Sequence, residues 1–543
     1  MLAAVLAATL AKAVWIQAVR AESLARKADA QHRETVIIPA SRGLISDRNG
    51  VELARDEVAI TISADPFLVK APAREAARAA TVLGLSGSEQ TALVGALSDK
   101  SKRFVYVKRQ VSVEKARKLK RMKLAGFQYA DDEKRVYPLG AVAAQVLGFA
   151  GVDKKGLAGI ELSYDRDLRG QAGEKTVIKD PSGDLIEVLQ AVDEKPGTNI
   201  TLSIDSQIQL EAERVLRETV QSWQARSATA TVLDPNTGEV LAMATAPGYD
   251  ANRFSDIPQA YWRNRAVTDD YEPGSTFKLV TVAGVLAENL VAPTTEFTLP
   301  YEIPVADKQI HDAHPRGTER MSVAEILSRS SNVGAVTLSQ KLGQESLARW
   351  IKRFGFGERT GIDYPGENSG RVPPPKQWYG STAGTVPIGQ GITVTPLQLA
   401  SAYAAIANGG VWVEPRLTLR VDGKRAKEPT RRRVVTPVVA TQLMSMLRDV
   451  VDEGTGTQAE IAGYTVAGKT GTAAKAIPGG YSDYRYEASF VGIVPASKPR
   501  LVILVNVDEP RGSIWGSVVA APAFKELALS CLQYLEVPPD KPS

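Results

Sequence analysis

The sequence predicts an α+β protein whose main domain has β-strands at both ends of a helix-rich centre. β-forming residues cluster at 200–204, at 229–243 and again between 464 and 507, whereas apolar residues recur at helical spacing between 275 and 453. Strands from both ends of one domain can complete a single sheet on which the intervening helices pack. We therefore expect one antiparallel sheet with helices on both sides.

The size and composition are those of a globular protein with several domains. The 543 residues suggest two to four domains, and 44% hydrophobic with 23% charged residues excludes a mainly disordered chain. The net charge of +5 is too small to indicate a nucleic-acid partner. Two basic clusters, at 100–123 and 424–433, are expected to be solvated surfaces.

Neither a disulfide nor a metal site is indicated. Cys531 is the single cysteine, and its apolar surroundings in the sequence predict a buried position. His311 and His314 have the spacing of metal ligands, but the only other histidine is His32, in the expected stalk. The glycine-rich segment 454–457 lacks the Lys-Ser/Thr of a phosphate loop and predicts a turn. We expect no metal and no cofactor.

The first residues predict a membrane anchor. Leu2 to Val19 is mostly Ala, Leu, Val and Ile, and at about 1.5 Å per residue it is about long enough to cross a bilayer core. Lys12 interrupts the run, and no basic residue precedes it. A cleaved signal peptide, for which Ala11-Lys12-Ala13 has the small-x-small form, and a buried helix are the alternatives. We expect an anchor at 1–19, with a truncated start as one interpretation, and a stalk at 20–33.

The remainder divides near Lys195-Pro196-Gly197, a strong turn signal. Residues 34–195 predict a β-rich pedestal with helices at 72–97 and 112–122, and residues 196–535 predict the main domain, followed by a tail at 536–543. The elements expected in the main domain are a helix at 207–223, helices at 275–290, 322–355, 396–408 and 435–453, strands at 464–468, 488–494 and 501–507, and a final helix at 520–534.

The pattern Ser275-x-x-Lys278 predicts a nucleophile with its base. Pro273 and Gly274 break the preceding chain and an apolar helical run follows, so Ser275 is expected at a helix N-terminus, where the positive helix end favours an oxyanion. Lys278 lies on the same face and can accept the serine proton. The pattern alone is weak, because Ser112-x-x-Lys115 also matches it on a strongly charged helix.

Two further elements follow in order, Ser330-Ser331-Asn332 and Lys469-Thr470-Gly471-Thr472. The second ends a β-like run with a glycine, as expected where an edge strand lets a substrate lie against its backbone. SxxK, S-D-N and K-T-G are the signature of class A β-lactamases and penicillin-binding proteins, and here Ser331 replaces the Asp. The three elements together predict serine acyl transfer.

The chain resembles a class B penicillin-binding protein, a peptidoglycan D,D-transpeptidase, and within that family the division-type (septal) enzymes. The resemblance covers nearly the whole chain and includes three pedestal motifs and two segments that flank the active site, at 42–50, 135–138, 159–161, 388–396 and 487–492. It implies a penicillin-binding, serine transpeptidase-like fold, preceded by an elongated β-rich pedestal and an N-terminal transmembrane helix. The short anchor, and the lack of a C-terminal extension seen in some relatives, depart from the family pattern.

The resemblance also implies a role for each motif residue. Ser275 would attack the carbonyl of the penultimate D-Ala with neutral Lys278 as base, and the backbone N–H groups of Ser275 and Thr472 would form the oxyanion hole, each worth about 3–4 kcal/mol. Ser330 and Asn332 would relay protons and hold the substrate amide. The remaining implied residues are Lys469, which tunes the electrostatics around Ser330, and the substrate-binding Thr470, Gly471 and Thr472.

Several alternatives remain open at this point. An elongation-type transpeptidase or a D,D-carboxypeptidase, with water as acceptor, would use the same residues, although Ser331 favours the septal type. A β-lactamase has no use for a pedestal, and a non-catalytic β-lactam sensor needs an output domain that the sequence does not indicate. Tyr481, Tyr484 and Tyr486 either line the entrance of the cleft or pack a hairpin.

The pedestal carries no catalytic pattern, so partner docking is expected there. The resemblance implies stem peptides and β-lactams as ligands, and a polytopic membrane glycosyltransferase with other division proteins as partners. It also implies a single-pass protein of the cytoplasmic membrane, with its catalytic domain on the extracytoplasmic side.

Overall fold

The computed structural model describes residues 1–18, 33–38, 40–179, 185–306, 308–378 and 380–541. The chain forms two compact units. Unit 1 contains residues 1–44, 56–135 and 166–198, and unit 2 contains residues 45–55, 136–165 and 199–543. The chain therefore passes between the units several times, which the single boundary expected near residue 195 does not capture.

Unit 1 contains two small sheets and a helical body. One sheet has the antiparallel strand order β1-β6-β7, and in the other β3 pairs with β4 and β5. The helix expected at 72–97 is two helices, because Gly84 adopts a left-handed conformation (φ 69°) that ends α3, and Ser86 caps α4. The elements are α1 (Leu2–Ala18), β1 (Arg33–Ile38), β3 (Glu52–Ala64), α3 (Pro72–Leu83), α4 (Gly87–Ser98), β4 (Val105–Ser112), α5 (Val113–Arg121), β5 (Phe127–Val136), α8 (Asp165–Leu168), β6 (Gly173–Lys179) and β7 (Leu185–Val192).

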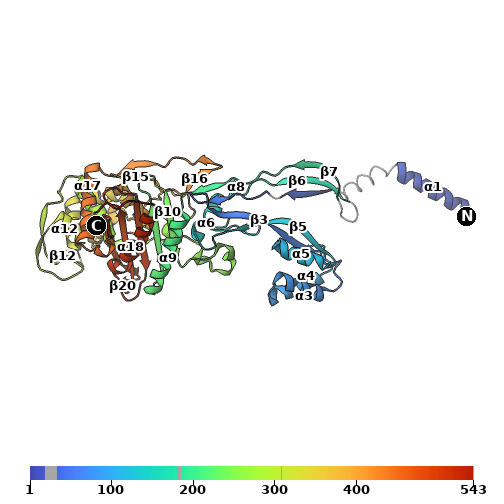
Figure 1. The fold of residues 1–543 in the computed structure, drawn as a ribbon, viewed down its shortest axis with the longest axis horizontal. Helices are drawn as coiled ribbons and strands as arrows, with labels where there is room; N and C mark the ends of the chain where they lie inside the picture. The colour runs from blue at the N-terminus through green and yellow to red at the C-terminus, as the bar shows by residue number, and fades with distance from the viewer. Residues whose placement is uncertain (19–32, 39, 180–184, 307, 379, 542–543) are drawn as a thin grey trace. The chain divides into compact units, whose positions relative to one another are not determined.

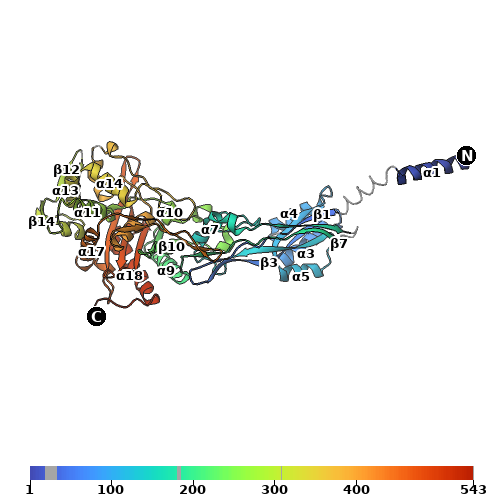
Figure 2. The ribbon, with the colours of Figure 1, turned by 90° about the horizontal axis from the view of Figure 1, so that it is seen from above.

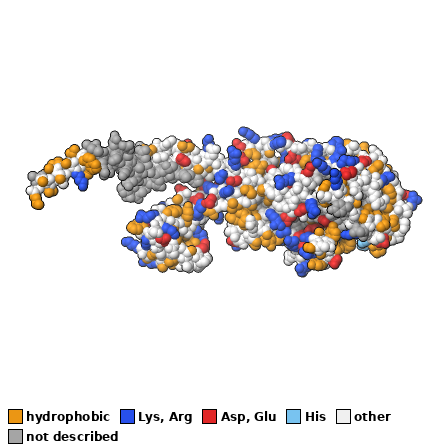
Figure 3. Space-filling view, turned by 180° about the vertical axis from the view of Figure 1, so that it is seen from behind, with side chains coloured by type: hydrophobic (Ala, Val, Ile, Leu, Met, Phe, Trp, Pro, Cys, Tyr) orange, Lys and Arg blue, Asp and Glu red, His pale blue; other side chains and the backbone are white. Residues whose placement is uncertain are grey.

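The basic cluster at 100–123 lies on the surface of the helical body of unit 1. Figure 3 shows Lys and Arg side chains over the visible face of this body. On α5, Arg117, Lys118, Lys120 and Arg121 are exposed, while Ala116 and Leu119 are buried in the core beneath. The expectation of a solvated basic face is confirmed for this cluster.

Two of the pedestal motifs meet at one buried carboxylate in unit 1. Asp56 accepts a hydrogen bond from the backbone N–H of Arg42 at 2.9 Å and pairs with the Arg135 guanidinium at 3.2 Å. Both side chains of the ion pair are less than a tenth exposed. Because a buried charge is costly unless it is paired, this contact fixes the relative position of the two motifs.

No described helix combines the length and the apolarity needed to cross a membrane. Helix α1 has 17 residues. The transmembrane helix expected at 1–19 is therefore not supported by the structure. The stalk expected at 20–33 lies, apart from Arg33, outside the described residues.

Unit 2 is built on a five-stranded antiparallel sheet with the order β10-β9-β21-β20-β19, which confirms the predicted single sheet (Figure 1). Strand β19 lies at one edge, and its central residues Lys469 and Gly471 pair only with β20 among the described strands. The strands are β9 (Ser227–Leu233), β10 (Val240–Ala246), β19 (Ala467–Ile477), β20 (Gly480–Val494) and β21 (Leu501–Asp508).

Helices cover both faces of this sheet. Helices α9 and α18 pack against one face in a core that includes Val215, Val232, Phe490 and Phe524, and α16 contacts β9 and β21 on the other. Figure 2 shows α11, α13 and α14 grouped together, apart from α9 and α18. The helices are α6 (Ala144–Leu147), α7 (Gly159–Ser163), α9 (Ser206–Ser222), α10 (Arg265–Thr268), α11 (Lys278–Ala287), α12 (Val323–Ser328), α13 (Asn332–Leu342), α14 (Gln344–Phe354), α15 (Thr382–Thr385), α16 (Pro396–Ala407), α17 (Pro437–Asp452) and α18 (Gly516–Tyr534).

Short strand pairs complete unit 2. Strands β17 (Lys424–Arg425), β16 (Thr418–Val421), β8 (Ile200–Leu202) and β2 (Ile45–Ser46) pair in that order, and the separate pairs are β11 (Glu296–Leu299) with β14 (Glu319–Ser322), β12 (Glu302–Val305) with β13 (Lys308–His311), and β15 (Val411–Val413) with β18 (Arg431–Arg433). The helix expected at 322–355 is three helices, because the helical conformation is interrupted at Ser330-Ser331 and at Gly343, which separates α12, α13 and α14.

Candidate active site

Ser275 lies in a single 3₁₀ turn, Gly274–Phe277, that runs directly into α11. Its position next to β19 depends on Gly274, which has φ +55°. A Cβ at Gly274 would stand 3.0 Å from the carbonyl oxygen of Thr472. Tyr403, fully buried, donates a hydrogen bond of 2.8 Å to the Thr276 carbonyl. The half-buried Ser275 is thus held at a helix start beside the edge strand, as the sequence predicts.

The Lys278 amine is fully buried beneath this turn. Its Nζ donates hydrogen bonds to the Ser330 carbonyl at 2.5 Å, to Asn332 Oδ1 at 2.7 Å and to Ser330 Oγ at 3.3 Å. Burial lowers the pKa of Lys278 to about 7, and the nearby Asp312 carboxylate opposes this shift. A lysine with such a pKa is partly neutral at physiological pH, as a general base requires.

A second buried lysine reaches the same hydroxyl. Lys469 Nζ donates to Ser330 Oγ at 2.9 Å. Burial, and secondarily the positive charge of Lys278, hold the pKa of Lys469 well below its usual range. Ser330 has φ +60°, a left-handed conformation that places its side chain between the two amines.

The turn that carries Ser330 and Asn332 is fixed by Asp312, a residue that the sequence analysis did not single out. The Asp312 carboxylate accepts hydrogen bonds from Ser331 Oγ at 3.0 Å and from the Val333 backbone N–H at 3.0 Å, and it pairs with Arg316 at 2.6 Å. Asn332 Nδ2 donates to the His311 carbonyl at 2.8 Å. The segment 311–316 therefore supports the Ser330 turn.

Strand β19 presents Thr470, Gly471 and Thr472 beside Ser275. Thr470 Oγ1 lies 3.0 Å from Thr455 Oγ1, and Thr472 Oγ1 accepts a hydrogen bond of 3.1 Å from the Gly516 backbone N–H. Gly471 has no room for a side chain, because a Cβ would stand 2.3 Å from Ser489 Oγ and 3.1 Å from the Pro273 carbonyl. The strand thus packs directly against the chain that leads to the nucleophile.

The structure brings together all the site residues predicted from sequence, from three separate segments. Within the described residues, no hydrogen bond joins Ser275 Oγ to Lys278 Nζ; catalytic contacts of this kind often tighten only when substrate is bound. No cluster of metal-ligating side chains exists in the described part of the chain. The arrangement suits acyl transfer through a serine ester.

Two family models match the chain. "Penicillin binding protein transpeptidase domain" matches residues 228–529, and "Penicillin-binding Protein dimerisation domain" matches residues 37–202. The chain belongs to the class B penicillin-binding proteins.

Similarity to individual penicillin-binding proteins extends over the whole chain. Peptidoglycan D,D-transpeptidase FtsI of Escherichia coli (strain K12) is 34% identical over 98% of this chain and 90% of its own length. Stage V sporulation protein D of Bacillus subtilis is also 34% identical, over 97% of this chain and 83% of its own.

The fold is likewise shared with solved penicillin-binding structures. A peptidoglycan synthetase from Bifidobacterium adolescentis is 30% identical with a TM-score of 0.76, over 94% of this chain and 98% of its own. Penicillin binding protein 3 from Mycobacterium tuberculosis, complexed with aztreonam, is 31% identical with a TM-score of 0.74, over 93% and 99%.

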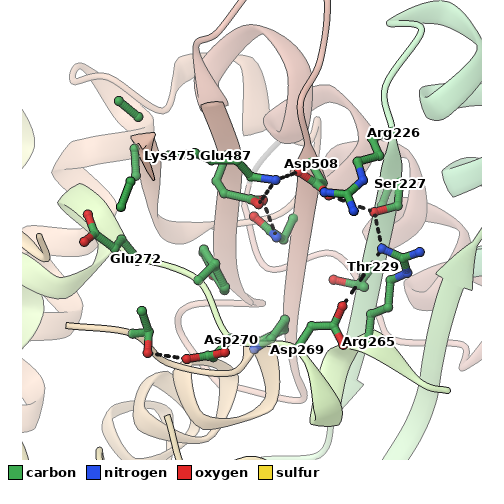
Figure 4. A pocket seen from close by; sticks show the side chains of 18 residues that line it. Arg226, Ser227, Thr229, Arg265, Asp269, Asp270, Glu272, Lys475, Glu487 and Asp508 are labelled. Atoms are coloured by element: carbon green, nitrogen blue, oxygen red, sulfur yellow. Dashed lines mark hydrogen bonds and ion pairs between the residues drawn. The ribbon is translucent and has the colours of Figure 1, made fainter. Parts of the chain in front are cut away.

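In this penicillin-binding protein an acidic pocket of about 330 Å³ adjoins the segment before Ser275 (Figure 4). Lys475 lies between Glu487 and Asp508, and burial raises the pKa of Glu487 to about 8. Burial also raises the pKa of Glu272, whose Oε1 accepts from the Gly391 N–H at 3.0 Å and from Tyr481 at 3.3 Å. The Glu272 contacts join the nucleophile segment to the β19–β20 hairpin.

The residues that sequence reasoning missed here share one property. Asp312, Thr455 and Gly516 contact Ser331, Thr470 and Thr472 respectively, each from 15 or more residues away along the chain. No local pattern marks them, although 454–457 and 311–314 were noticed for other reasons. Of the three tyrosines, Tyr481 reaches the cleft through Glu272.

Proposed function

We propose that this penicillin-binding protein is a peptidoglycan D,D-transpeptidase that cross-links stem peptides through an acyl-enzyme on Ser275, in septal wall synthesis. One observation carries the proposal: buried Lys278, with a pKa lowered to about 7, lies one helical turn after Ser275 and hydrogen-bonds both Ser330 and Asn332. A base with these properties can take the serine proton at neutral pH.

In the acylation half-reaction, Ser275 Oγ attacks the carbonyl carbon of the penultimate D-Ala, and its proton passes to Lys278 Nζ. The backbone N–H groups of Ser275 and Thr472 stabilise the oxyanion. Ser330 Oγ, between Lys278 and Lys469, delivers a proton to the leaving D-Ala nitrogen. The C–N bond breaks, and an ester remains on Ser275.

Strand β19 binds the donor stem peptide in this proposal. Its edge position allows an extended peptide to add along the strand, and Gly471, which has no side chain, lets the strand lie directly against the Pro273 segment that leads to Ser275. The hydroxyls of Thr470 and Thr472 bind the terminal carboxylate, and Asn332 holds the substrate amide. Deacylation by an amine of a neighbouring stem gives the cross-link, and β-lactams trap the enzyme because they acylate the same serine.

Labelled penicillin tests the proposed nucleophile. Ser275→Ala is expected to abolish the covalent adduct, whereas Ser112→Ala, which removes the other SxxK serine, leaves it intact. An adduct of normal yield on Ser275→Ala would exclude the proposal.

The lifetime of the adduct separates the alternative functions. A transpeptidase is expected to hold the penicilloyl ester for much longer than a β-lactamase, whose turnover would be rapid. Hydrolysis without any amide product when a stem-peptide amine is present would identify a D,D-carboxypeptidase. For the cellular role, depletion should give filaments if the enzyme is septal and rounded cells if it serves elongation.

We assign partner docking to the pedestal, at 34–195, and catalysis to residues 196–535, with a tail at 536–543. The partners are a polytopic membrane glycosyltransferase and other division proteins, and the catalytic domain lies on the extracytoplasmic side, where peptidoglycan is made. Replacing the exposed Arg117 and Arg121 of α5 by Glu tests this assignment. Unchanged co-purification of the glycosyltransferase would show that this face of the pedestal is not the contact.

A further inference from the structure

A surface hollow of about 660 Å³ lies before the start of α18. It is lined by Tyr484 of β20 and by the segment 510–515, which connects β21 to α18. Two aromatic rings face solvent in it, since Tyr484 is 75% and Trp515 is 39% exposed. Large exposed aromatic side chains at a concave surface are typical of binding sites.

The hollow is connected to the proposed carboxylate site. Segment 510–515 ends at Gly516, whose backbone N–H donates to Thr472 Oγ1 at 3.1 Å. The Trp515 ring centroid lies 5.6 Å from that of His314. His314 belongs to the segment that supports the Ser330 turn, so Trp515 reaches from the sheet side of the cleft to the loop side.

The chemistry of deacylation decides from which side the second substrate arrives. In the proposed function, which this inference presupposes, the leaving D-Ala has its carboxylate at Thr470 and Thr472. The attacking amine must approach the acyl carbon on Ser275 from the position that the D-Ala nitrogen has vacated. That position lies toward Thr472, and therefore toward Trp515 and the hollow.

We propose that the hollow between Tyr484 and Trp515 is the acceptor site, which binds the second stem peptide and presents its side-chain amine to the acyl-enzyme. The amine nitrogen bonds to the acyl carbon, the bond from that carbon to Ser275 Oγ breaks, and the amine proton returns to Oγ through Lys278. Every atom comes from the acyl-enzyme and the acceptor, so the step needs no further reactant.

The lining also indicates how the acceptor is recognised. A stem peptide is a short chain with aliphatic side chains and a terminal carboxylate. The faces of Tyr484 and Trp515 can cover the aliphatic part. Arg511 is exposed in the same hollow and has no ion-pair partner within the described structure, so its guanidinium is available to the terminal carboxylate.

The test measures how the acyl-enzyme of the full chain divides between amine and water. The donor is a D-Ala-D-Ala peptide whose own amines are acetylated, and the acceptor is a stem tetrapeptide with one free side-chain amine. The ratio of amide to acid product is measured for Trp515→Leu, Tyr484→Leu and Arg511→Gln. Because both products come from one acyl-enzyme, slower acylation leaves the ratio unchanged.

We expect the ratio to fall by about tenfold for Trp515→Leu, the size of effect typical of a central aromatic contact, and to fall also for Tyr484→Leu. Arg511→Gln should lower it for the tetrapeptide acid but not for the tetrapeptide amide. The matched controls Tyr534→Leu and Arg500→Gln, which replace an exposed tyrosine and an exposed arginine outside the hollow, should not change it.

Unchanged ratios in all three hollow variants would overturn the acceptor site. So would an Arg511→Gln effect that is equal for acid and amide acceptors. Failure of the proposed function gives a different result, namely a wild-type enzyme that gives acid only, or a penicillin adduct of normal yield on Ser275→Ala. The two failures are therefore distinguishable.

Discussion

Removing the Asp312 carboxylate should destabilise unit 2 and slow acylation. Asp312 and Arg316 are 9% and 10% exposed and lie 2.6 Å apart, so Asp312→Ala leaves a buried guanidinium without its counter-charge. Breaking a buried pair in this way costs about 3–5 kcal/mol. The same variant removes the acceptor for Ser331 Oγ and for the Val333 N–H, so the turn that carries Ser330 loses two of its attachments.

The assay is denaturant unfolding, monitored at the unfolding transition that penicillin acylation shifts. The free energy of unfolding is measured for Asp312→Ala, Arg316→Met and the double variant. The double variant should lose less free energy of unfolding than the sum of the losses of the two single variants, because no unpaired buried charge remains. Arg320→Met, whose pair with Glu296 is largely exposed, should cost about 0–1 kcal/mol. A loss below about 1 kcal/mol for Asp312→Ala, or strict additivity in the double variant, would refute the reasoning.

Three further predictions concern the same site. Because neutral Lys278 is the base and its pKa is about 7, the rate of penicillin acylation should rise as pH rises through 7. Asp312→Asn removes the negative charge that raises the pKa of Lys278, so in this variant the rise should occur at lower pH. A rate that is constant over this range would exclude Lys278 as the base. Gly471→Ala should abolish acylation by pushing β19 away from Pro273, whereas Gly317→Ala, where nothing lies within 4 Å of the new Cβ, should acylate normally; the acylation rates of the two variants measure the difference. Tyr403→Phe should cost about 1–3 kcal/mol in unfolding free energy, because the buried Thr276 carbonyl loses its 2.8 Å donor, and a stability equal to wild type would show that this contact is not needed.

The sequence predicts most of the fold wherever the signal is local. The start of the helix at Ser275, the hairpin of β9 and β10 and the final helix are found where periodicity and turn residues place them. The strands near 464–494 are longer than predicted, since alanines and a tyrosine-rich hairpin continue the β19–β20 ladder to Ile477 and Gly480. The extension depends on pairing with the neighbouring strand, which local propensity does not report.

In the candidate site, too, the sequence predicts the residues that belong to local motifs but not those that contact the motifs from distant segments. Lys278 and Lys469 follow from motifs, and the structure brings both to Ser330. The support given by Asp312 could not be predicted, because it depends on how β13 positions a loop against a distant turn. The catalytic roles of the motif residues stay predictions until the variants are measured.

Lys278 and Lys469 both donate hydrogen bonds to Ser330 Oγ, so the protonation of one amine affects the protonation of the other. Two ammonium groups this close in a dry interior repel each other by several kcal/mol, even at an effective dielectric constant of about 20. Protonation of one amine therefore disfavours protonation of the other, which agrees with the lowered pKa of Lys469. When Lys278 takes the proton of Ser275, this repulsion favours transfer of a proton through Ser330 Oγ to the departing group. Acylation thus returns its proton to the product without requiring a water molecule in the cleft, where water would hydrolyse the ester.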